Sequence, residues 1–100
     1  MNQNSKPLFD LGQIVATPDC IEALKASGEQ PAKFLRRHVT GDFGDLDEED
    51  RVLNEQAVTN GDRIFSAYVL QNGTKIWVIT EMKGDDGKRA STCCLLPENY

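Results

Sequence analysis

The chain has 100 residues, of which 39% are hydrophobic and 27% are charged, and its formal net charge is −5. This length fits one domain with a single modest core and excludes a catalytic domain joined to a regulatory one. Six acids and no base lie between Asp42 and Asp50, while the bases are scattered through the rest of the chain, so direct nucleic-acid binding is not expected.

Residues 1–10 are expected to form a flexible tail before a single α+β domain at residues 11–100. The tail contains one lysine and no apolar run, so it does not resemble a secretory signal. No stretch approaches the roughly 20 apolar residues of a membrane-spanning helix. The three cysteines lack the spacing of a disulfide framework. Together these features predict a cytoplasmic protein with reduced thiols and no membrane partner.

A short strand at residues 13–17 is expected to lead into two helices. Thr17-Pro18 predicts the first helix start, because Thr can cap it and Pro fits the first helical position. Gly28 can end that helix in the left-handed conformation. Gln30-Pro31 begins a second helix, which Gly41 terminates. The apolar stripe of the second helix consists of Phe34, Leu35, His38 and Val39.

A third helix is expected after a turn-rich linker at residues 41–46. Asp45 or Asp47 can cap it, and it should run to about Asn60, where Asn-Gly is a stop signal. The acids of its first turn complement the positive end of the helix dipole. The residues expected to face inward are Val52, Leu53, Gln56 and Ala57.

The β part is expected to be an antiparallel meander. Residues 63–71 and 74–83 are rich in β-branched and aromatic side chains, and Asn72-Gly73 between them favours a two-residue type I′ turn. A third strand at residues 90–96 ends at Pro97. The predicted fold is therefore α+β, in the order β-α-α-α-β-β-β, with three short helices packed on a three- to four-stranded antiparallel sheet.

A two-residue turn would fix which residues of the hairpin face one another. Tyr68 is expected opposite Trp77, and Val69 opposite Ile76. One face then carries Phe65, Ala67, Val69, Ile76 and Val78, and the second carries Ile64, Tyr68, Leu70, Trp77 and Ile79. Both faces would be apolar, whereas a sheet with one solvated face alternates apolar and polar residues. The second face therefore needs a cover, either helices of the same chain or another molecule.

Four segments of the chain stand out together: Gly12–Pro18, Arg37–Leu46, Thr74–Glu81 and Leu95–Tyr100. They resemble a family of short bacterial proteins encoded on plasmids and integrative elements, and the resemblance spans Leu11 to Tyr100. Members of that family often have Trp in place of Phe43 and Glu in place of Asn99. The resemblance implies a mobile-element accessory protein that acts on host defence or element maintenance. It implies no established activity, cofactor or catalytic residue.

The cluster of His38, Asp42 and Asp45 has two interpretations. A small metal-dependent hydrolase or nuclease would use these side chains as ligands or as an acid–base pair. An EF-hand loop starting at Asp45 fails, because Asp50 stands where Gly is needed and Gln56 where Glu is needed. Zinc would need more His or Cys at short spacing. The alternative is that the acids cap and solvate a helix start, so no metal, cofactor or catalytic residue is predicted.

The sequence favours a small non-enzymatic protein that acts by protein–protein contact, with another protein or a second copy as the partner. A structural homodimer is a further alternative. Aromatic anchors carry a large share of interface energy, and spaced carboxylates can complement a basic groove. The predicted interaction face joins the second sheet face to the acidic turn and consists of Tyr68, Trp77, Ile79, Asp42, Phe43, Asp45 and Glu48.

Overall fold

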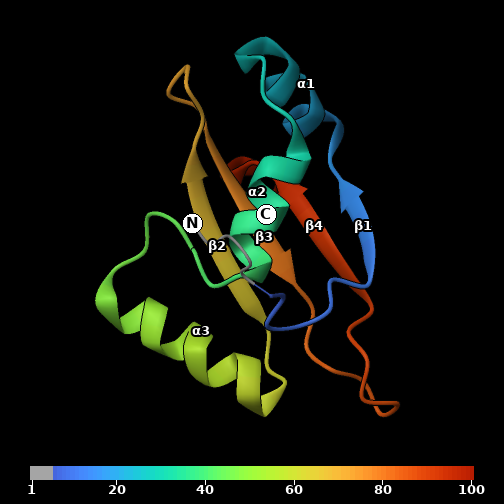
Figure 1. The fold of residues 1–100 in the computed structure, drawn as a ribbon. Helices are drawn as coiled ribbons and strands as arrows, with labels where there is room; N and C mark the ends of the chain where they lie inside the picture. Colours follow the sequence, from blue (N-terminus) through green and yellow to red (C-terminus); the bar gives the residue numbers. More distant parts are fainter. Residues whose placement is uncertain (1–5) are drawn as a thin grey trace.

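The computed structural model describes residues 6–100, and the elements within that range confirm the predicted order and the α+β class (Figure 1). No helix in these residues is long and apolar enough to cross a bilayer. The elements are β1 (Gln13–Ala16), α1 (Pro18–Ser27), α2 (Pro31–Val39), α3 (Glu48–Asn60), β2 (Ile64–Val69), β3 (Lys75–Thr80), β4 (Ser91–Leu95) and the 3-10 helix η1 (Pro97–Asn99).

The predicted tail lies partly outside the described residues, which exclude residues 1–5. Phe9 is buried with Phe43 and Ile64, and the Leu8 N–H donates to the Val39 carbonyl over 2.8 Å. Chain packing therefore begins before Leu11, the expected start of the domain.

The sheet has the strand order β1-β4-β3-β2. The meander β2-β3-β4 is antiparallel, as predicted. β1 pairs with β4 in parallel, so the sheet is mixed, and the expectation of a purely antiparallel sheet is wrong. Parallel neighbours need a long connection, which the three helices and the hairpin supply here. β1 and β2 form the two edges of the sheet.

The helix starts follow the predicted capping. The Thr17 side chain accepts from the Cys20 N–H, and the Asp47 side chain from the Asp50 N–H. The inward face predicted for α3 is confirmed at Ala57, which is buried, but is wrong at Val52, Leu53 and Gln56, which are exposed. Asn54 is buried in their place. Asn54 takes the inward position because its amide hydrogen-bonds both backbone groups of Phe65, at 2.5 and 3.1 Å.

The hairpin closes on three residues, 71–73, and not on the predicted two. The Leu70 N–H donates to the Thr74 carbonyl over 2.8 Å, and the Gly73 N–H donates to the Leu70 carbonyl over 2.9 Å. Gly73 has a φ of 90°, whereas no described non-glycine residue has a positive φ. A type I′ turn would need positive φ at Asn72 as well. The turn is therefore a tight turn followed by a left-handed glycine, and Ala67 lies opposite Trp77.

This register moves every β3 side chain to the face opposite the predicted one. The face covered by helices, called the helix face, carries the even-numbered residues Ile64, Ser66, Tyr68, Ile76, Val78 and Thr80, all buried. The other face, called the open face, carries Phe65, Ala67, Val69, Lys75, Trp77 and Ile79. Tyr68 therefore does not share a face with Trp77 and Ile79, so the predicted assignment of side chains to the two faces is wrong, although both faces remain largely apolar.

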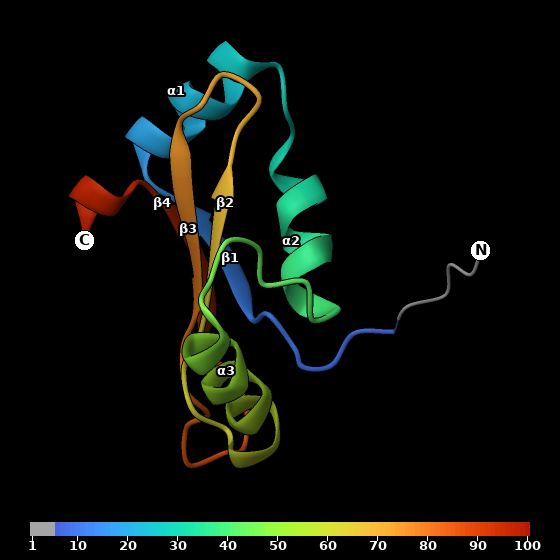
Figure 2. The same ribbon diagram turned by 90° about the vertical axis from the view of Figure 1, so that its left-hand side faces the viewer.

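The main core lies between the helix face and the helices α1 and α2. Figure 2 shows α2 on one side of the sheet and η1 on the other. The buried residues of this core are Cys20, Leu24, Phe34, Leu35, Tyr68, Leu70, Ile76, Val78 and Cys94. The 3-10 helix η1 packs on the open face (Figure 2). The aromatic residues of this face, Phe65 and Trp77, are partly exposed, whereas Tyr68 on the helix face is buried.

Candidate functional site

His38 lies in the core and does not join Asp42 and Asp45. It is fully buried, and its Nδ1 and Nε2 lie 2.5 Å from Ser66 Oγ and 2.8 Å from Thr80 Oγ1. Burial, with a smaller contribution from Arg89, lowers the pKa of His38 to about 4. Within residues 6–100, no group of three His, Cys, Asp or Glu could hold a metal ion. The convergence of His38, Asp42 and Asp45 on one metal ion, which the predicted hydrolase would require, is therefore not present in these residues.

Asp42 contacts Arg37 and Tyr68 and so fixes the loop that follows α2. Its carboxylate accepts from Arg37 Nε over 2.7 Å, a hydrogen bond that lowers the pKa of Asp42. The Tyr68 hydroxyl donates to the Asp42 carbonyl over 2.7 Å, and the Arg37 guanidinium lies 4.5 Å from the centre of the Tyr68 ring. Phe43 is 3% exposed and Tyr68 is 1% exposed. Phe43 and Tyr68, both predicted for the interaction face, are therefore core residues in this fold.

The next residues of this loop run along the edge of β2. The Ala67 N–H donates to the Phe43 carbonyl over 3.1 Å, and the Asp45 N–H donates to the Ala67 carbonyl over 2.7 Å. Gly44 lies between them with a φ of 79°, and a Cβ there would stand 2.0 Å from the Ala67 carbonyl oxygen. Only glycine fits this approach, which holds Asp45 beside β2.

We expect Gly44→Ala to lower the free energy of unfolding by about 2 kcal/mol, because it combines a strained backbone with a clash against β2. Urea unfolding followed by Trp77 fluorescence measures the change. Gly28→Ala is the matched control, because Gly28 also has a positive φ, of 71°, but nothing lies within 4 Å of its added Cβ. Equal losses in the two variants would contradict a tight contact at Gly44.

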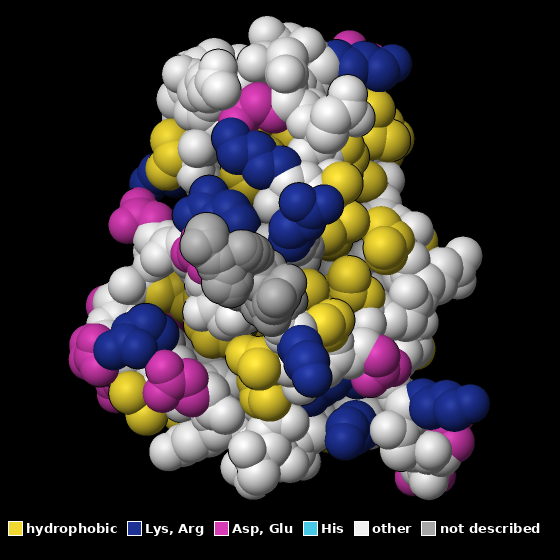
Figure 3. Space-filling model, viewed as in Figure 1, with side chains coloured by type: hydrophobic (Ala, Val, Ile, Leu, Met, Phe, Trp, Pro, Cys, Tyr) yellow, Lys and Arg dark blue, Asp and Glu magenta, His cyan; other side chains and the backbone are white. Residues whose placement is uncertain are grey.

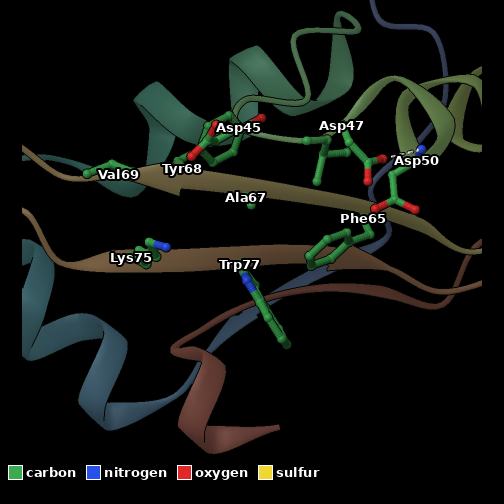
Figure 4. A pocket seen from close by; sticks show the side chains of 10 residues that line it. Asp45, Asp47, Asp50, Phe65, Ala67, Tyr68, Val69, Lys75 and Trp77 are labelled. Carbon is green, nitrogen blue, oxygen red and sulfur yellow. Dashed lines mark hydrogen bonds between the residues drawn. The ribbon is translucent and has the colours of Figure 1, made fainter.

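A hollow of about 310 Å³ lies between this loop, the start of α3 and the open face (Figure 4). Figure 4 shows three aspartates on the outer side of β2, the Phe65 ring between β2 and β3, and Trp77 projecting from β3 away from the aspartates. We call this hollow the acid–aromatic cleft. Its lining residues are Asp45, Leu46, Asp47, Asp50, Phe65, Ala67, Tyr68, Val69, Lys75 and Trp77.

The aromatic side of the cleft continues across the open face. The Phe65 and Trp77 rings meet edge to face with their centroids 5.1 Å apart, and Trp77 meets Tyr100 at 5.7 Å. The Arg63 guanidinium lies 5.4 Å from the centre of the Tyr100 ring. Trp77 is partly exposed, whereas Ile79 is 5% exposed. Trp77 is therefore the aromatic residue of the predicted face that both reaches the surface and lines the cleft.

The acidic side is formed by carboxylates without a basic partner. Among residues 6–100, the ion pairs involve neither Asp45, Asp47 nor Asp50. Lys75 is the one base in the lining. Glu48, predicted for the interaction face, instead forms an ion pair with Arg51 and does not line the cleft. Unpaired carboxylates next to aromatic rings suit a cationic group with an apolar stem.

The cysteines offer no second site. All three are free, and burial raises the pKa of Cys20 to about 11 and that of Cys94 to about 12. Their thiols are therefore protonated at neutral pH, where a nucleophile would need the thiolate.

Comparisons with protein-family models, curated proteins and solved structures found no match to this chain.

Proposed function

We propose that this chain is a small non-enzymatic interaction protein that binds a basic segment of a partner protein in the acid–aromatic cleft. The observation that supports this proposal is that Phe65 and Trp77 line the same hollow as three aspartates that form no ion pair within residues 6–100. An arginine or lysine side chain could place its apolar stem on the aromatic rings and its charge between the carboxylates. The cleft thus supports recognition of a cationic side chain.

The cellular setting proposed for this contact is the cytoplasm of a bacterium that carries a mobile element. Its support is the resemblance of Gly12–Pro18, Arg37–Leu46, Thr74–Glu81 and Leu95–Tyr100 to short proteins encoded on such elements. On this proposal the partner belongs to host defence or to maintenance of the element. It presents a basic surface, because the cleft and the acidic turn present the opposite charge.

A peptide array tests the proposed contact. Peptides that combine arginine or lysine with apolar residues are probed with the protein, and the best binder is titrated while Trp77 fluorescence is recorded. We expect Asp45→Asn combined with Asp50→Asn to weaken that binding about tenfold or more, because a charge-assisted contact is worth roughly 1.5–3 kcal/mol. Binding should also weaken as salt is raised.

The matched control removes the same two charges elsewhere. Glu22 and Asp85 are exposed and do not line the cleft. Glu22→Gln combined with Asp85→Asn should change the affinity less than about twofold, because exposed distant charges are largely screened. Equal losses in both double variants would show that net charge, and not the cleft, attracts the peptide. An array without a basic binder would also contradict the proposal.

A further inference from the structure

The two edges of the sheet differ in whether their outward backbone groups are already hydrogen-bonded. At the β2 edge, the outward groups of Phe65 and Ala67 are. The outward backbone groups of Ala67 bond to Phe43 and Asp45 of the preceding loop. Those of Phe65 bond to the side-chain amide of Asn54. A loop and a helix side chain therefore satisfy the part of the β2 edge where another strand could pair.

The β1 edge has no such cover within residues 6–100, and Figure 1 shows β1 at the outer margin of the sheet. The N–H groups of Gln13 and Thr17 donate inward to Ala90 and Cys94, each over 3.0 Å. Backbone groups alternate in direction along a strand, so the N–H and C=O groups of Ile14 and Ala16 point outward. No described residue bonds to them, and they form a template for one more strand.

The side chains of β1 are those of a strand that is paired on both sides. Natural edge strands are protected by charged residues, prolines within the strand or bulges. Residues 11–18 contain no charged side chain, although 27% of the chain is charged. Ile14 and Val15, which point to opposite faces of the sheet, are 51% and 40% exposed. Figure 3 shows hydrophobic side chains reaching the surface on the β1 side of the helix face.

We propose that β1 pairs in antiparallel fashion with β1 of a second copy of this chain, which joins the two sheets into one. The outward groups belong to Ile14 and Ala16, so a symmetric pair places Ile14 of each copy opposite Ala16 of the other. Val15 then lies opposite Val15 of the second copy, in the close, non-hydrogen-bonded position. A second copy is the favoured occupant because this register brings apolar side chains together and opposes no like charges.

This dimer goes beyond the proposed binding function and does not compete with it. β1 and the acid–aromatic cleft lie at opposite edges of the sheet, since the cleft borders β2. Each copy therefore keeps its cleft accessible. A failure of dimerisation leaves peptide binding unaffected, and a loss of peptide binding leaves dimerisation unaffected.

Sedimentation velocity across a concentration series tests the pairing. Wild-type protein should form dimers, and Val15→Lys and Val15→Glu should each be monomeric, because each places two like charges side by side. An equimolar mixture of the two variants should restore a dimer, because Lys then faces Glu. Val52→Lys, on α3 at a matched exposure of 37%, should remain as dimeric as wild type. Circular dichroism checks that every variant is folded.

Three results would overturn the proposal. Wild-type protein that is monomeric up to millimolar concentration would show that the β1 edge stays unpaired. A dimer that persists in folded Val15→Lys would place the contact on another surface. Folded Lys and Glu variants that fail to associate when mixed would contradict the position of Val15 at the symmetry axis.

Discussion

Replacing Arg89 with methionine should lower the free energy of unfolding by about 3–5 kcal/mol, because it removes three hydrogen bonds that one buried side chain donates to backbone carbonyls. Arg89 is 2% exposed. Its Nη1 donates to the carbonyls of Asp62 and Glu81 over 2.7 and 3.0 Å, and its Nη2 donates to that of Ala57 over 3.1 Å. Ala57 lies near the C-terminal end of α3, where a cation also complements the helix dipole.

The loss is measured by urea unfolding with Trp77 fluorescence as the signal. Lys88→Met is the matched control, because Lys88 is the exposed neighbour of Arg89 and undergoes the same loss of charge. Its effect should stay within about 0.5 kcal/mol. If Arg89→Met destabilises the protein no more than Lys88→Met does, the Arg89 guanidinium does not hold α3 to the sheet.

The free energy of unfolding should also fall by about 3 kcal/mol between pH 7 and pH 4 through His38 alone. The pKa of His38 is lowered from 6.5 to about 4 in the folded state, chiefly by burial. Above pH 6.5 the imidazole is neutral in both states, and its contribution is fully present. As the pH falls toward 4, the unfolded chain binds a proton that the folded chain excludes, so stability decreases.

Urea unfolding at a series of pH values measures this dependence, with His38→Gln as the comparison. The variant should be less stable at pH 7, because the bonds to Ser66 and Thr80 are disturbed. It should lose less stability than wild type between pH 6.5 and pH 4. Identical pH slopes would contradict a neutral buried His38.

Glu29 adds a separate loss of stability at lower pH. Hydrogen bonds from the Ser27 hydroxyl, the Gln71 N–H and Lys33 lower the pKa of Glu29 to about 2, from 4.5. Its stabilising contribution is therefore present above pH 4.5 and is lost as the pH falls toward 2. Glu29→Gln should flatten the pH profile in this lower range while the His38 range keeps its slope, and a profile unchanged below pH 4.5 would contradict this role.

The helices and the element order could be predicted because their signals are local. Thr17-Pro18 and Asp47 act on backbone groups within one helical turn, and Gly28 acts on the turn just before it. Such capping depends little on the rest of the fold. The strand regions also have a local signal, which is their runs of β-branched and aromatic residues.

The hairpin register could not be predicted because Asn72-Gly73 is compatible with two turns. In a two-residue turn Gly73 is the second turn residue, whereas here it follows the turn in the left-handed conformation. The three-residue loop places Ser66 and Thr80 on the helix face, where both hydrogen-bond His38. These hydrogen bonds between buried polar side chains are consistent with the three-residue loop. They join residues far apart in the sequence, so no local sequence pattern predicts them.

Only part of the lining of the cleft can be predicted from the sequence. The acidic block and Trp77 could be singled out, and both Asp45 and Trp77 line the cleft. The contact of Asp45 with Ala67 joins residues 22 apart in sequence, through a backbone approach at Gly44. No periodic pattern signals such a contact. For the same reason no sequence pattern places Phe65, Asp47 and Asp50 in one hollow with Trp77.

An NMR titration of the labelled protein with a peptide that contains arginine and apolar residues tests the proposed binding site most directly. We expect the largest shift changes at the Trp77 indole N–H and at the backbone amides of Ala67 and Asp45, with little change along β1. Those changes should vanish in the Asp45→Asn, Asp50→Asn variant. Shifts of similar size at acids outside the cleft, such as Glu22 and Asp85, or shifts that avoid Trp77, would contradict the assignment of the cleft as the binding site.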